Sequence, residues 1–85
     1  MPDFLYPIHM TVSDLRALFV ATLTRSHGGN PRRWAQALGD IRLHSLATHS
    51  HCNWSIAPSG SPAETDAIEA LADTLRLHHP VVTRD

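Results

Sequence analysis

Residues 41–57, which read IRLHSLATHSHCNWSIA, decide the fold because apolar and polar side chains alternate in two separate stretches. Ile41 and Leu43 alternate with polar neighbours in the first stretch, and Trp54 and Ile56 do so in the second. A period of two is typical of a strand with one buried face. Two such strands joined by a short connection most simply pair as an antiparallel hairpin. The pattern therefore predicts a hairpin whose apolar face packs against the rest of the chain.

Two helices are predicted before this hairpin. Thr11 and Asp14 form a capping box for the first helix, apolar residues follow at helical spacing, and the Gly-Gly pair at 28–29 ends it. Asn30 caps the second helix, and a proline at its first position needs no amide donor there. This second helix is expected to be short, over residues 31–38.

A third helix is predicted after the hairpin by the clearest local signal in the chain. Ser61 is its cap, proline follows at the first helical position, and the Glu64 carboxylate can reach back to the cap amide. The helix is expected over residues 62–78, and Pro80 ends it. The two valines at 81–82 are expected to add an edge strand or to pack on the hairpin.

The resulting order is α-α-β-β-α, which predicts an α+β fold: a small antiparallel β-hairpin covered on one face by three helices. We expect a single small globular domain over residues 1–85, with an N-terminal arm at residues 1–10. A chain this short buries only about 60–65% of its unfolded surface, so its core is thin. A thin core favours self-association or a permanent protein partner.

Composition narrows the class of protein. The net charge is −1, so no strong field draws the chain to nucleic acid or to anionic lipid. The charge is uneven: residues 1–44 carry an excess of arginine, and residues 45–85 carry an excess of carboxylates. Basic residues are all arginine, which is typical of a GC-rich bacterial coding sequence. An apolar run at 15–23 is too short to span a membrane, and a single cysteine suits the reducing cytoplasm.

The histidines of the hairpin are candidate metal ligands. If the apolar residues of the hairpin face the helices, His44, His49 and His51 share the opposite face. A register with residue 44 opposite residue 51 brings two imidazoles within reach of one ion, and zinc or nickel suits such ligands. Cys52 points the other way in a regular strand and needs a bulge to join them. The pattern predicts a metal site as the first alternative function.

A cysteine nucleophile is a weaker hypothesis. Cys52 lies between His51 and Asn53, which are the residue types of a Cys-His-Asn site. Adjacent residues of a strand project to opposite faces, so these three side chains cannot form the required hydrogen bonds. We therefore expect no enzyme and no catalytic residues.

Nucleic-acid binding is the second alternative. Arg25, Arg32 and Arg33 flank the turn at residues 28–30, and the two helices around it loosely match a helix-turn-helix. Guanidinium groups and free amides at the start of a helix bind phosphates. The second helix is short for reading base edges, however, and the net charge disfavours salt-driven binding.

Aromatic residues are the candidate anchors for a partner. Phe4 and Tyr6 lie in the N-terminal arm and Trp54 in the hairpin, and Trp and Tyr are favoured at interfaces. The sequence as a whole predicts a small, non-enzymatic, cytoplasmic bacterial protein without a cofactor. We expect it to act through protein–protein contact, as an accessory or regulatory module that self-associates or binds a protein partner.

Overall fold

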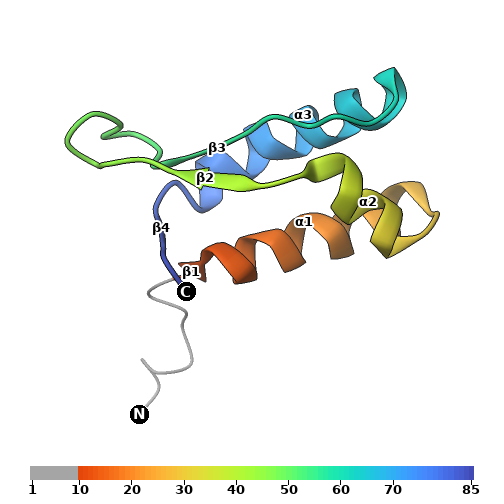
Figure 1. The fold of residues 1–85 in the computed structure, drawn as a ribbon, viewed down its shortest axis with the longest axis horizontal. Coiled ribbons are helices and arrows are strands. Elements are labelled where there is room, and N and C mark those ends of the chain that lie inside the picture. Colours follow the sequence, from red (N-terminus) through yellow and green to blue (C-terminus); the bar gives the residue numbers. More distant parts are fainter. Residues whose placement is uncertain (1–9) are drawn as a thin grey trace, which may run out of the picture.

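The computed structural model describes residues 10–85, which form three helices and two pairs of strands (Figure 1). The predicted order α-α-β-β-α is confirmed, and a two-residue strand is added near each end. In chain order the elements are β1 (Met10–Thr11), α1 (Val12–His27), α2 (Pro31–Leu38), β2 (Ile41–Leu43), β3 (Trp54–Ile56), α3 (Pro62–His78) and β4 (Val82–Thr83).

The helices begin where their capping residues predict. At the start of α1, the Asp14 amide donates to the Thr11 hydroxyl and the Thr11 amide donates to the Asp14 carboxylate, both over 3.1 Å. Ser61 and Glu64 form the equivalent box at the start of α3. These reciprocal bonds satisfy amides that have no partner within the helix, which fixes the first residue of each helix.

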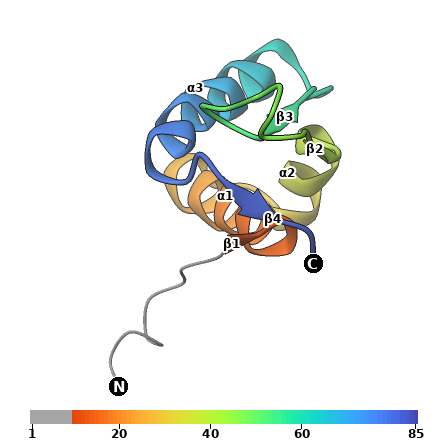
Figure 2. The same ribbon diagram turned by 90° about the vertical axis from the view of Figure 1, so that its left-hand side faces the viewer.

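The three helices enclose a core with the hairpin. In the view of Figure 2, α1 and α3 lie side by side on one side of the core, and α2 and the hairpin lie on the opposite side. Arg16 of α1 reaches across to α2, where its guanidinium donates to the carbonyls of Ala35 and Gly39. The largest side chains that are fully buried come from the three helices and from β4: Phe19, Leu15, Leu23, Leu38, Ile68 and Val82.

The hairpin has the predicted antiparallel pairing but shorter strands than the alternation suggested. Ile41 is paired with Ile56 and Leu43 with Trp54, so these four side chains share one face of the hairpin. That face packs on the helices, and the ring of Trp54 meets Phe19 edge to face at 5.8 Å. Regular pairing stops beyond Leu43 because the chain turns into a loop that is closed by its own hydrogen bonds.

The C-terminal strand β4 pairs in parallel with β1, with Met10 opposite Val82. The expected edge strand is therefore present: its backbone pairs with β1, and the side chain of Asn53 joins it to the hairpin. Asp85, just beyond β4, accepts a hydrogen bond from the Ser13 amide in the first turn of α1 at 2.9 Å. A carboxylate at that position interacts favourably with the positive end of the helix.

Candidate functional site

The loop between β2 and β3 brings two of the predicted histidines together. The rings of His44 and His49 stack with centroids 4.2 Å apart and planes inclined by only 17°. Nε2 of His44 is also 2.7 Å from the hydroxyl of Ser55 on β3. The register differs from the one that a two-histidine site needs, because the His44 amide donates to the carbonyl of Asn53 and not to residue 51.

The second ring of this stack is held by its neighbour in the loop. The Thr48 hydroxyl donates to the Ser45 carbonyl and lies 2.9 Å from Nδ1 of His49. Since the hydroxyl hydrogen is used by Ser45, Nδ1 of His49 donates in this contact. This contact fixes the orientation of the His49 ring against His44.

The stacked arrangement does not itself form a metal centre. A metal binds in the plane of each imidazole about 2.0–2.1 Å from nitrogen, and nearly parallel rings direct their lone pairs into separate planes. His51 is exposed and Cys52 is half-buried, with its thiol 3.5 Å from the Trp54 carbonyl. Within residues 10–85, no group of three or more His, Cys, Asp and Glu side chains is placed to hold one ion.

The arginines of the nucleic-acid hypothesis are separated by their contacts. Arg25 and Arg32 are exposed, whereas Arg33 forms a bidentate pair with Glu64 on α3. Its Nε and Nη2 lie 2.9 and 2.7 Å from the two carboxylate oxygens. These hydrogen bonds raise the pKa of Arg33 and hold the pKa of Glu64 at about 2. A carboxylate bound to Arg33 competes with any phosphate that would use the same guanidinium.

Trp54 is not the surface anchor that the sequence suggested. Its side chain is only 2% exposed, and its Nε1 donates to the His79 carbonyl at 2.8 Å. The alternation places it on the core face of the hairpin, where a large ring fills the space against α1. Phe4 and Tyr6, the other two expected anchors, lie outside the described residues.

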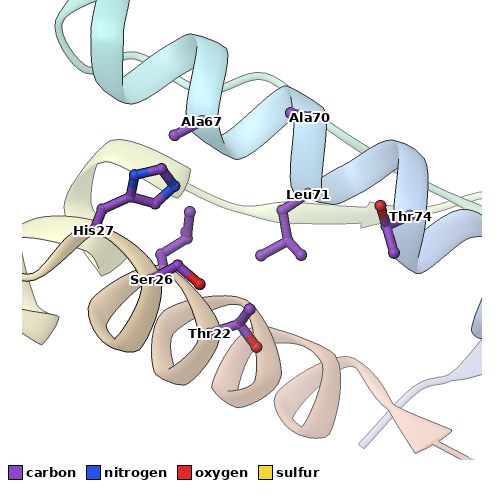
Figure 3. Close-up of a pocket in the computed structure, with 8 residues that line it drawn as sticks. Thr22, Ser26, His27, Ala67, Ala70, Leu71 and Thr74 are labelled. Atoms are coloured by element: carbon purple, nitrogen blue, oxygen red, sulfur yellow. The ribbon is translucent and has the colours of Figure 1, made fainter.

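A groove between α1 and α3 is a second candidate site (Figure 3). Its volume is about 280 Å³, and side chains of the two helices line it from opposite sides. The lining is made of small and apolar residues with one histidine: Thr22, Leu23, Ser26 and His27 from α1, and Ala67, Ala70, Leu71 and Thr74 from α3. Small side chains leave the backbones of both helices open to close approach by another surface.

Two oppositely charged residues lie on the helices that form this groove. Arg25 follows Thr22 by three positions on α1, and Asp66 precedes Ala70 by four on α3, so each shares a helix face with a lining residue. The helices are antiparallel, as Figure 1 shows, so both charges lie near the same end of the groove. Within residues 10–85, neither of these two side chains forms an ion pair.

Sequence reasoning missed this groove. Alanine and threonine are compatible with the inside and the outside of a helix, so their pattern does not reveal an open face. The small residues at positions 63, 67, 70 and 74 of α3 were the available signal, because they leave one side of that helix without a large side chain.

No helix within residues 10–85 has the length and apolar character required to cross a membrane. Comparisons with known protein families, with curated proteins and with solved structures find no match to this chain.

Proposed function

We propose that this protein works through protein–protein contact, as a small accessory or regulatory module that self-associates along α1 and α3. The observation that carries the proposal is the open groove between these helices, lined by small and apolar side chains. In this proposal the chain has no catalytic role, and it resides in the bacterial cytoplasm, where its unpaired Cys52 stays reduced.

A second copy fits the opposite charges on the two helices that form the groove. A half-turn about an axis parallel to the groove places α1 of one protomer over α3 of the other. Because this rotation keeps each end of the groove in place, Arg25 of each copy meets Asp66 of the other. An isologous contact of this kind repeats every interaction twice, so one favourable charge pair becomes two.

The surface formed by α1 and α3 is large enough for a weakly associating dimer. A helix of 16 residues, such as α1, is about 24 Å long, and two helices side by side are about 20 Å wide. Stable interfaces bury about 800 Å² per partner. A two-helix face therefore supports a dimer at the small end of that range, which we expect to dissociate at low concentration.

Sedimentation velocity over a concentration series tests this proposal. We expect a monomer–dimer equilibrium in the wild type and a shift to monomer in Ala70→Arg, because Ala70 lines the groove and is exposed. Ala57→Arg, at an exposed position after β3, adds the same charge elsewhere and serves as the matched control. A wild type that remains monomeric up to about millimolar concentration would refute the proposal.

Charge reversal tests the orientation of the two copies. Arg25→Asp and Asp66→Arg should each weaken the dimer, whereas the double variant should restore it, because the pair is re-formed with opposite signs. If the dimer affinity of the double variant is reduced by the sum of the two single effects, this orientation is excluded. The groove itself would then still be the contact between the two copies.

Metal binding by the hairpin loop is the second candidate function. The observation in its favour is that the structure brings His44 and His49 into contact, and a rotation of one ring would let both nitrogens approach one ion. Native mass spectrometry of untagged protein titrated with zinc or nickel tests it. His49→Gln should remove the bound metal and His78→Gln, on α3, should retain it; a wild-type spectrum unchanged by either metal would reject this function.

A further inference from the structure

The outer edge of β2 has no backbone partner within residues 10–85. The His44 amide donates to the Asn53 carbonyl on the β3 side at 2.7 Å, and the backbone groups of successive residues in a strand alternate between its two edges. The amides and carbonyls of Ile41 and Leu43 therefore point away from β3. In the part of the chain that the structure describes, β2 pairs only with β3, and these outward groups form no backbone hydrogen bond.

An apolar groove lies beside this edge. Its volume is about 370 Å³, and it is lined by Val12, Ile41, Leu43, Arg84 and Asp85. The three apolar side chains are only half-buried by residues 10–85. An uncovered strand edge next to apolar side chains is the kind of surface to which an extended segment adds as a further strand. The added backbone supplies hydrogen bonds, and its alternate side chains fill the groove.

We propose that residues 3–6 of the same chain add to β2 as this strand, and that Phe4 and Tyr6 fill the groove. Nine residues precede Met10 in the sequence. Met10 is two residues from Val12, which lines the groove, so it lies within about 7 Å of that wall. The four-residue step from Tyr6 to Met10 spans up to about 14 Å, so the segment reaches the groove without leaving its own molecule.

The sequence of this segment fits a short added strand. Aromatic residues favour strands, and Phe4 and Tyr6 are two positions apart, so both rings lie on one face of a strand. Pro7 biases the residue before it toward an extended backbone, and its missing amide ends the pairing. Residues 7–9 then remain as the link to β1.

Charge supports the same register. Arg42 is exposed and points to the opposite face of β2 from Ile41 and Leu43. When the two aromatic rings lie over those apolar side chains, Asp3 lies on the outer face, diagonal to Arg42 and within reach of its long side chain. Within residues 10–85, Arg42 forms no ion pair. The N-terminal segment therefore brings a carboxylate to the one charged residue of β2.

Amide hydrogen exchange of the full chain, measured by NMR, tests the proposal. The amides of Ile41 and Leu43 should be protected, because the added strand supplies their acceptors. In the double variant Phe4→Ala, Tyr6→Ala, their protection factors should fall at least about tenfold, since two buried rings are lost. The His44 amide, which is bound within the hairpin, should stay protected in both proteins and so report that the hairpin is intact.

Leu5→Ala is the matched control, because position 5 lies on the outer face of the added strand. It should leave the protection factors of Ile41 and Leu43 within about twofold of the wild type. The docking does not depend on the groove between α1 and α3. Ala70→Arg should therefore show the same protection as the wild type, at low and at high protein concentration.

Each of four results would overturn the proposal. The first is rapid exchange of the Ile41 and Leu43 amides in the wild type, and the second is undiminished protection in the double variant. The third is an equal loss of protection in Leu5→Ala and the double variant. The fourth is protection that rises with the concentration of Ala70→Arg, which would mean that a second copy supplies the strand.

Discussion

The side chain of Asn53 and the backbone of Val82 exchange two hydrogen bonds, in the manner of two paired strands. Nδ2 of Asn53 donates to the Val82 carbonyl at 2.8 Å, and the Val82 amide donates to Oδ1 at 2.9 Å. Asn53 is the one polar residue buried within residues 10–85, at 7% exposure. It links the hairpin to β4, whose other edge is paired with β1.

Replacing this side chain should destabilise the protein strongly. In Asn53→Ala, the buried amide and carbonyl of Val82 both lose their partner, which costs about 2 kcal/mol or more in the free energy of unfolding. Urea denaturation followed by tryptophan fluorescence measures this loss. Asn30→Ala, which removes an exposed helix cap, should cost only about 1 kcal/mol. Equal losses in the two variants would show that the link between the hairpin and β4 contributes little.

The pairing of Glu64 with Arg33 should make stability depend on pH. The hydrogen bond from Arg33, followed by that from the Ser61 amide, lowers the pKa of Glu64 from 4.5 to about 2. A lowered pKa in the folded state stabilises the protein above the unfolded value, and this contribution is lost as the pH falls from about 4.5 to 2. The difference in unfolding free energy between the wild type and Glu64→Gln should therefore be larger at pH 6 than at pH 2.5.

Glu69→Gln, at an exposed position of the same helix, provides the control for this measurement. The difference in unfolding free energy between Glu69→Gln and the wild type should change little over the same pH range. The reason is that Glu69 has no ion-pair partner within residues 10–85. If the difference in unfolding free energy between Glu64→Gln and the wild type is the same at both pH values, the pair with Arg33 does not make stability depend on pH.

The turn before α3 has no room for a side chain at Gly60. A Cβ atom there would lie 2.9 Å from the Cβ atoms of both Ala37 and Glu64. We expect Gly60→Ala to destabilise the protein by about 1–3 kcal/mol, because α2 and the start of α3 must move apart. Gly28→Ala is the comparison: the space there is empty, but a φ of 76° with a ψ of −166° is a conformation almost confined to glycine, so backbone strain alone should cost about 1–3 kcal/mol. Thermal unfolding followed by circular dichroism will rank the two variants.

The contact between Phe19 and Trp54 should be sensitive to a small change in shape. Phe19→Leu keeps an apolar side chain but removes the edge-to-face contact of the two rings, so we expect a loss of about 1–2 kcal/mol. Leu77→Ala, at a position that is 81% exposed, should stay within about 0.5 kcal/mol of the wild type. Urea denaturation distinguishes these outcomes. A Phe19→Leu variant that is as stable as the wild type would mean that the two rings are loosely packed.

The sequence by itself determined the helices and the buried face of the hairpin. Both α2 (Pro31–Leu38) and α3 (Pro62–His78) have the bounds that their caps predicted. A cap acts on amides within one turn of itself, and strand alternation depends only on adjacent residues. Such signals are local, so the sequence contains them before any tertiary contact forms.

Only the tertiary structure decided how these elements meet. The stack of His44 and His49 depends on the path of a loop, and the bond between Asn53 and Val82 joins residues that are 29 positions apart. The groove between α1 and α3 exists because those two helices pack against each other while their small residues remain on the outside. Each of these features depends on the relative positions of distant segments, which the packing of the shared core sets and a local pattern does not encode.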